Sequence, residues 1–129
     1  MIKEQENHLR SSKEDWLSFR INEAHLDHAK MATVEIIGSL ETDNAKKFED
    51  QLTALFNQEI KNLILNFSGL RFINSGGIGS LVQMVFKFKE AEGSVKLVEL
   101  PEKFMVLFDM LGLVSLLEIY GTEKEAMNT

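Results

Sequence analysis

The sequence predicts an α/β fold: one domain in which a mixed β-sheet of about five strands is covered by about four helices. Short apolar runs rich in β-branched residues alternate along the chain with segments whose apolar residues recur at helical spacing. The first two strand-like runs have no helix between them, which indicates a hairpin before the alternation begins. With 129 residues, 44% of them hydrophobic, the chain can bury one core and leaves little room for a second domain.

The first third of the chain is expected to hold an extension and the hairpin. Residues 1–15 are polar and of mixed charge, and we expect them to form a flexible N-terminal extension. Residues 16–21 alternate as a strand does, and residues 31–37 are rich in β-branched side chains and end at a glycine. Residues 22–30 between them are polar and are expected to form a loop.

The middle of the chain is expected to form two helices with a buried strand between them. Thr42 or Asp43 can cap the first helix. The apolar stripe of that helix is Ala45, Phe48, Leu52, Leu55 and Phe56. Residues 63–67 are almost continuously apolar, which is typical of a strand buried on both faces. The second helix follows the segment 74–79, and its apolar stripe is Ile78, Leu81, Val82, Val85 and Phe88.

The last third predicts two more strands and two more helices. Residues 95–98 suit a strand, and Pro101 suits the first turn of a third helix that ends at Gly112. The expected buried stripe of the third helix is Phe104, Leu107, Phe108 and Leu111. Residues 117–120 suit a last strand, and residues 122–125 (TEKE) match a capping box that starts a terminal helix.

Composition excludes several classes of function. The chain has no cysteine, so it has no disulfide, no thiolate zinc site and no cysteine nucleophile. Its net charge of −6 argues against nucleic-acid binding, which needs a basic face. It opens without an apolar signal segment, and its densest apolar stretch, residues 104–117, is too short to cross a bilayer. We therefore expect a cytoplasmic protein that does not insert into membranes.

No residue pattern indicates catalysis or metal binding. His8 lies in the expected extension, and His25 and His28 lie in the expected loop, so we interpret all three as solvated side chains. The glycine-rich residues 76–80 lack the lysine of a P-loop and the glycine spacing of a dinucleotide site. We expect no catalytic residue, no metal and no cofactor, and hence no enzyme activity.

The most unusual local feature is the segment 74–79 (NSGGIG), which follows a strand and begins a helix. Asn74 or Ser75 can accept hydrogen bonds from the free amides of the first turn, which the glycines leave accessible. Such a helix start is electropositive and favours an anion, including a phosphoryl group on a nearby hydroxyl. A plain helix cap with glycines that suit a tight turn is the alternative, and the residue types leave both open.

Residues 66–81 (NFSGLRFINSGGIGSL) resemble the signature of STAS domains, the anti-sigma-factor antagonists and their relatives. Residues 35–40 (EIIGSL) resemble the family's strand before its first helix, and residues 107–113 (LFDMLGL) its segment before the final strand. The resemblance implies a single STAS-like domain over residues 16–129. It also implies partner switching: the unphosphorylated domain binds an ATPase-type serine kinase that doubles as an anti-sigma factor. Phosphorylation at the start of the second helix breaks that complex, and a phosphatase restores it.

The sequence departs from the family pattern at the phosphorylation site. The hydroxyl residue usually phosphorylated is replaced by Gly76, and two acidic residues of the pattern are replaced by Asn66 and Asn74. Ser75 is the hydroxyl that remains in the cap. Two interpretations stay open: Ser75 accepts the phosphate, or the domain binds constitutively and phosphorylation does not regulate it.

The expected partner surface combines the start of the second helix with two apolar residues of the third. Val106 and Met110 lie one turn apart, on the side of their helix away from its buried stripe. Met84 and Phe86 lie at the margins of the second helix's apolar arc, and burial in the core explains them equally well. The partner surface is thus expected to be Asn74, Ser75, Gly76, Gly77, Val106 and Met110. A different STAS function also stays open, in which the chain binds the ATPase of an ABC transporter.

Overall fold

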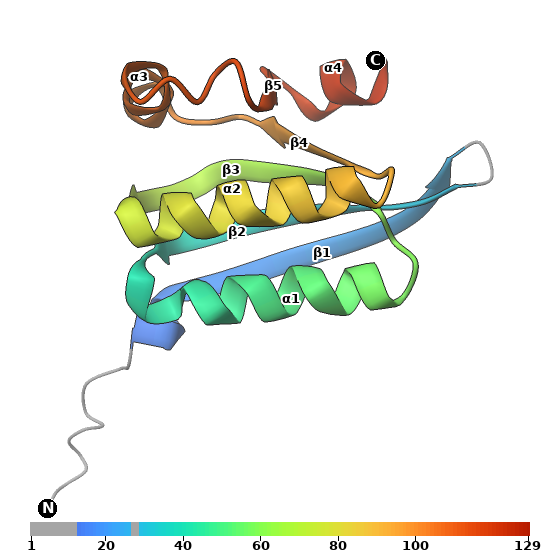
Figure 1. The fold of residues 1–129 in the computed structure, drawn as a ribbon, viewed down its shortest axis with the longest axis horizontal. Helices are drawn as coiled ribbons and strands as arrows, with labels where there is room; N and C mark the ends of the chain where they lie inside the picture. The colour runs from blue at the N-terminus through green and yellow to red at the C-terminus, as the bar shows by residue number, and fades with distance from the viewer. Residues whose placement is uncertain (1–12, 27–28) are drawn as a thin grey trace, which may run out of the picture.

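The computed structural model describes residues 13–26 and 29–129, and a five-stranded sheet runs through this part of the chain (Figure 1). The strands are β1 (Leu17–Leu26), β2 (Ala29–Leu40), β3 (Asn62–Ile73), β4 (Ser94–Val98) and β5 (Glu118–Tyr120). They lie side by side in chain order. β1 pairs antiparallel with β2, and every later pair is parallel, so the predicted mixed sheet is confirmed.

The described residues also form four α-helices and two 3-10 helices. They are η1 (Lys13–Trp16), η2 (Thr42–Asn44), α1 (Ala45–Asn57), α2 (Ser75–Glu90), α3 (Glu102–Met110) and α4 (Glu123–Met127). Figure 1 shows α1 and α2 running side by side across one face of the sheet. The order of elements agrees with the prediction, apart from the two short 3-10 turns.

The core lies mainly between the sheet and α1 and α2. Because side chains alternate along a strand, β2 directs Ala32, Val34 and Ile36 into this core and the residues between them to the other face. α3 adds Phe104 and Phe108 to the same core. On the other face, α4 covers a smaller cluster that contains Met31, Ile64, Val98 and Ala126. Residues 63–67 of β3 are buried throughout, as predicted for a strand covered on both faces.

The polar segment at residues 22–30 is not the loop that its composition predicts. β1 continues to Leu26 and β2 begins at Ala29, with Asn22 opposite Thr33 and His25 opposite Lys30. Backbone pairing carries the hairpin past the end of the helices, where both faces meet solvent and polar side chains are tolerated (Figure 1). His25 is therefore an exposed strand residue. His8, His28 and residues 1–12 of the expected extension lie outside the described residues.

Two local predictions at helix ends are wrong. Neither Thr42 nor Asp43 caps α1, because Asn44 turns inward, accepts from the Glu41 N–H (2.8 Å) and donates to the Ser39 carbonyl (2.8 Å). Leu111 is 54% exposed although its spacing predicts burial. Leu111 is the C-cap of α3, with its N–H still bonded to the Leu107 carbonyl (3.0 Å), and the chain leaves the helix directly after it at Gly112, which has a φ of +73°.

Candidate functional site

Asn74 organises the start of α2. Its side-chain Oδ1 accepts one hydrogen bond from the Gly77 N–H (3.0 Å) and another from the Thr42 N–H (3.1 Å). The first bond caps α2 in the way that the sequence predicts for Asn74. The second ties the connection between β2 and α1 to the same point, although Thr42 and Asn74 are 32 positions apart. The Asn74 side chain therefore holds the start of α2 and the β2–α1 connection together.

The two glycines that follow are required by close packing. A Cβ added at Gly76 would lie 2.7 Å from the Thr42 Cβ and still closer to its Oγ1. A Cβ added at Gly77 would lie 2.7 Å from the Leu40 carbonyl carbon. Neither glycine has a positive φ, so the constraint is space rather than backbone conformation. The end of β2 and its connection to α1 fill the volume that side chains at these positions would need.

Ser75 is the first residue of α2 and is exposed. The structure describes all of α2, and the first turn of this helix carries no acidic residue. Its last turn carries Lys87 and Lys89. Because a helix dipole is positive at its N-terminus, α2 itself would not repel a negative group on Ser75. The Ser75 side chain is thus exposed at a helix start whose own first turn carries no negative charge.

Asn66 lies away from the start of α2. It is 7% exposed, and its Nδ2 donates to the carboxylates of Glu99 (3.2 Å) and Glu123 (2.8 Å). Its Oδ1 accepts from the Ser68 N–H (2.9 Å). The amide group of Asn66 therefore bridges two carboxylates from separate segments, and an aspartate in its place would bring a third negative charge to them.

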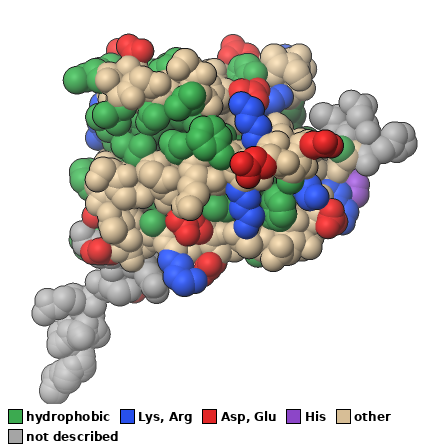
Figure 2. Space-filling model, viewed as in Figure 1, with side chains coloured by type: hydrophobic (Ala, Val, Ile, Leu, Met, Phe, Trp, Pro, Cys, Tyr) green, Lys and Arg blue, Asp and Glu red, His purple; other side chains and the backbone are tan. Residues whose placement is uncertain are grey.

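Exposed apolar side chains gather at the end of the domain where α2 begins. Val106 is 51% exposed and Met110 79% exposed, as their positions on α3 predict. Phe72, Leu111 and Leu116 are also about half exposed. Figure 1 places α3 and the start of α2 at the same end of the domain, and Figure 2 shows hydrophobic side chains gathered there. We call Val106, Met110 and Leu111, which lie on α3 and at its C-cap, the α3 surface.

The margins of α2 differ from each other. Met84 is 4% exposed and belongs to the core, whereas Phe86 is 40% exposed. The alternative of simple burial is therefore correct for Met84 and wrong for Phe86. Sequence periodicity did not indicate that Phe72 and Leu111 would be exposed. Phe72 lies in the part of β3 beyond the predicted strand at residues 63–67, and Leu111 has the spacing of the buried stripe of α3.

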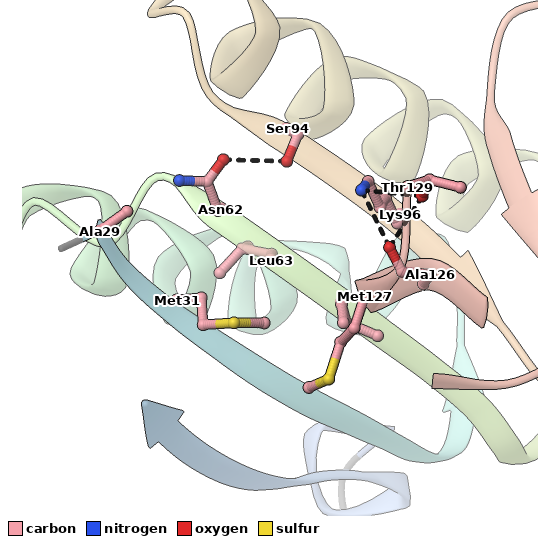
Figure 3. Close-up of a pocket in the computed structure, with 10 residues that line it drawn as sticks. Ala29, Met31, Asn62, Leu63, Ser94, Lys96, Ala126, Met127 and Thr129 are labelled. Carbon is pink, nitrogen blue, oxygen red and sulfur yellow. Dashed lines mark hydrogen bonds between the residues drawn. The ribbon is translucent and has the colours of Figure 1, made fainter. Parts of the chain in front are cut away.

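A separate pocket of about 200 Å³ opens on the other face of the sheet, beside α4 (Figure 3). Its polar groups satisfy one another: Lys96 Nζ donates to the Ala126 carbonyl (3.0 Å) and to Thr129 Oγ1 (3.2 Å). Ser94 Oγ donates to Asn62 Oδ1 (3.0 Å) across the same pocket. The lysine thereby holds α4 against the sheet.

The described residues contain neither a metal-binding cluster nor a membrane-spanning helix. No three of their histidine, aspartate and glutamate side chains come together in a way that could hold a metal ion. None of their helices is long and apolar enough to cross a bilayer.

A comparison with protein families decides the family of the chain. The model of the STAS domain matches residues 22–126. The chain belongs to the STAS domain family. Its fold is similar to the anti-sigma factor antagonist SpoIIAA in its unphosphorylated form, with 18% identity, a TM-score of 0.64, and coverage of 86% of this chain and 96% of that chain. The phosphorylated form of SpoIIAA, from Bacillus, gives 20% identity, a TM-score of 0.62 and coverage of 86% and 97%.

Two further solved structures show how widely this fold occurs. An anti-sigma factor antagonist from Mycobacterium paratuberculosis is 20% identical, with a TM-score of 0.65 and coverage of 84% of this chain and 92% of that one. The murine anion transporter Slc26a9 is 14% identical, with a TM-score of 0.70 and coverage of 88% of this chain and 22% of that one. At these identities the likeness establishes the fold. The fold is thus shared by antagonists of anti-sigma factors and by part of a membrane transporter.

Within this STAS domain, the expected site residues fall into two groups. Asn74, Ser75, Gly76 and Gly77 form the start of α2. Val106 and Met110 belong to the neighbouring α3 surface. Thr42 also belongs to the α2 start, and sequence analysis missed it because its contact with Gly76 depends on the tertiary fold.

Proposed function

We propose that this STAS domain is a regulatory protein-binding module of a partner-switching system. In this proposal it binds an anti-sigma factor that is also an ATPase-type serine kinase, and so antagonises it in the cytoplasm. The observation that carries the proposal is the exposed α2 start beside the apolar α3 surface, on a fold that SpoIIAA shares. An exposed apolar group of this kind often marks a protein contact.

The proposed contact joins Asn74, Ser75, Gly76 and Gly77 with Val106 and Met110. The apolar residues of α3 are suited to be buried against a partner, and the α2 start offers a rigid polar edge beside them. The domain acts by binding and by being modified, so we propose no catalytic role for its own residues.

Phosphorylation of Ser75 is the proposed control. A phosphoryl group adds about −1.5 to −2 charges, so a contact shaped for a neutral hydroxyl would lose its fit. The exposure of Ser75 and the solved phosphorylated and unphosphorylated forms of SpoIIAA support this proposal. A phosphatase would then return the chain to its binding form. In the competing version, the domain binds constitutively and phosphorylation has no effect.

A second candidate function is a STAS subunit of a transporter, bound to the ATPase of an ABC transporter. The likeness to part of Slc26a9 favours a transporter setting, although that protein is an anion transporter. The two candidates predict different partners for the same surface.

Calorimetric titration tests the proposal with two purified probes from the organism that makes this chain. These are an anti-sigma factor with serine kinase activity and an ABC-transporter ATPase. We expect the native chain to bind the first probe, and Met110→Glu to weaken binding about tenfold or more, because the change places a charge in an apolar contact. Met127→Glu is the matched control, since Met127 is also exposed but lies on α4, beside the pocket on the other face of the sheet.

Equal binding by both variants would show that the α3 surface is not the contact. Binding to the transporter ATPase alone would establish the second candidate instead. Ser75→Glu then separates the two versions of control: loss of binding supports the phosphorylation switch, and unchanged binding supports the constitutive version.

A further inference from the structure

Thr42 occupies the space that a side chain at position 76 would need. A Cβ at Gly76 would lie 2.7 Å from the Thr42 Cβ and 2.9 Å from the Thr42 Cα, and its nearest neighbour would be the Thr42 Oγ1. Real Cβ atoms do not approach other atoms so closely. The hydroxyl of Thr42 therefore lies beside the α2 start, at the position where a side chain of residue 76 would begin.

The position of Thr42 is fixed by the same side chain that caps α2. Asn74 Oδ1 accepts from the Thr42 N–H (3.1 Å) and from the Gly77 N–H (3.0 Å). Thr42 is nevertheless exposed, as Ser75 is. Two exposed hydroxyl residues from different elements thus lie at one helix start, where the Asn74 side chain joins the backbone of Thr42 to that of Gly77 in the first turn of α2.

We propose that Thr42 is a phosphorylation site of this chain, and that its hydroxyl takes the place of the side chain absent at position 76. The inference rests on the proposed function, because it places a second modifiable hydroxyl at the same partner contact. In the reaction, Thr42 Oγ1 forms a bond to the γ-phosphorus of ATP, and the bond from that phosphorus to the β,γ-bridging oxygen breaks. ADP leaves, and a base of the serine/threonine kinase takes the hydroxyl proton.

The surroundings of Thr42 make such a phosphate effective. It would add about −1.5 to −2 charges at an exposed site next to the positive end of α2. Asp43 is exposed and adjacent in sequence, so the local negative charge would grow. A partner that contacts the α2 start would meet this charge directly, as it would a phosphate on Ser75.

Tryptic mapping distinguishes the two hydroxyls without ambiguity. Cleavage after Lys30 and Lys46 releases residues 31–46 (MATVEIIGSLETDNAK), which contain Thr42. Cleavage after Arg71 and Lys87 releases residues 72–87, which contain Ser75. The full chain is incubated with radiolabelled ATP and an extract of its own cells, and the labelled residue is located by fragmentation of each peptide. We expect label in residues 31–46, on Thr42.

Two variants of the same peptide provide the control. Thr42→Val removes the proposed acceptor and should abolish the label in residues 31–46. Thr33→Val changes a half-buried threonine of β2 in that peptide and should leave the label unchanged. Thermal unfolding of both variants checks that they are folded. Thr42→Asp should weaken binding to the purified anti-sigma kinase about tenfold or more, equivalent to about 1.4 kcal/mol.

The outcomes separate this inference from the proposed function. Label only in residues 72–87, or in neither peptide, overturns the role of Thr42. It leaves the proposed function untouched, because calorimetry alone tests binding to the anti-sigma kinase. Label on Thr42 in a chain that does not bind the kinase supports the modification and overturns the proposed partner.

In a third experiment, Thr42→Gly with Gly76→Ser moves the hydroxyl onto α2, and we expect the label to move to residues 72–87 at position 76.

Discussion

The Asn66 side chain donates a 2.8 Å hydrogen bond to the carboxylate of Glu123, which joins β3 to the first turn of α4. The two residues are 57 positions apart, and the same amide nitrogen also donates to Glu99. An aspartate has no N–H to donate, so this position of the fold selects asparagine. The departure from the family pattern at Asn66 therefore has a structural reason that is independent of the start of α2.

We predict that Asn66→Asp lowers the free energy of unfolding by about 1–3 kcal/mol, because a nearly buried carboxylate would face two others without a donor between them. Urea unfolding of both proteins measures the difference. Asn62→Asp is the matched control on the same strand. Asn62 Oδ1 accepts from Ser94 Oγ (3.0 Å), and an aspartate keeps that acceptor, so the control should change stability by no more than about 0.5 kcal/mol. Equal losses in the two variants would contradict the prediction.

The Thr42–Gly76 contact gives a second prediction. Gly76→Ala should destabilise the domain by about 1–3 kcal/mol, because the new Cβ overlaps Thr42. Gly79→Ala is the control in the same helix: nothing lies within 4 Å of a Cβ there, so the change should stabilise by up to about 1 kcal/mol. Denaturant unfolding measures both changes.

A double-mutant cycle tests the cause of that loss. Thr42→Gly should recover part of the stability lost in Gly76→Ala, with a coupling of about 0.5–3 kcal/mol, because it removes the atoms in conflict. Additive effects of the two changes would mean that Thr42 is not what excludes a side chain at position 76.

Helix stripes and the cap of α2 could be predicted from the sequence, because both depend on residues close together in the chain. Phe48 and Leu52 repeat at helical spacing, and Asn74 precedes the amide of Gly77 that it caps. The contact between Thr42 and Gly76 could not be predicted, because it exists only when the β2–α1 connection packs on α2.

The prediction of a loop at residues 22–30 failed for a different reason. Strand pairing there is made by backbone groups, while the exposed side chains are polar, so hydrophobic alternation gives no signal. Leu111 has helical spacing and is the C-cap of α3, so whether another element covers it depends on where the helix ends. Pattern alone does not determine that end to within one residue.

The Asn74 cap gives a third prediction. Asn74→Ala should lower the free energy of unfolding by about 0.5–2 kcal/mol, since it removes the acceptor for the Gly77 and Thr42 N–H groups. Asn74→Asp keeps the acceptor and adds a negative charge at the positive end of α2. Its free energy of unfolding should therefore be at least that of the native chain, and higher by up to about 1 kcal/mol. Calorimetric unfolding compares the three proteins. A loss in Asn74→Asp as large as that in Asn74→Ala would show that the acceptor is not what matters.

Truncating a side chain should lower stability much more on the buried side of α3 than on its exposed side. Phe108 is fully buried in the core, so Phe108→Ala should cost about 3–5 kcal/mol in unfolding free energy. Met110 is 79% exposed, so Met110→Ala should change stability by no more than about 0.5 kcal/mol. Chemical denaturation of the isolated chain measures both. If Met110→Ala destabilised the chain as Phe108→Ala does, Met110 would be part of the core, and any effect of Met110→Glu on partner binding would have to be attributed to misfolding rather than to a lost contact.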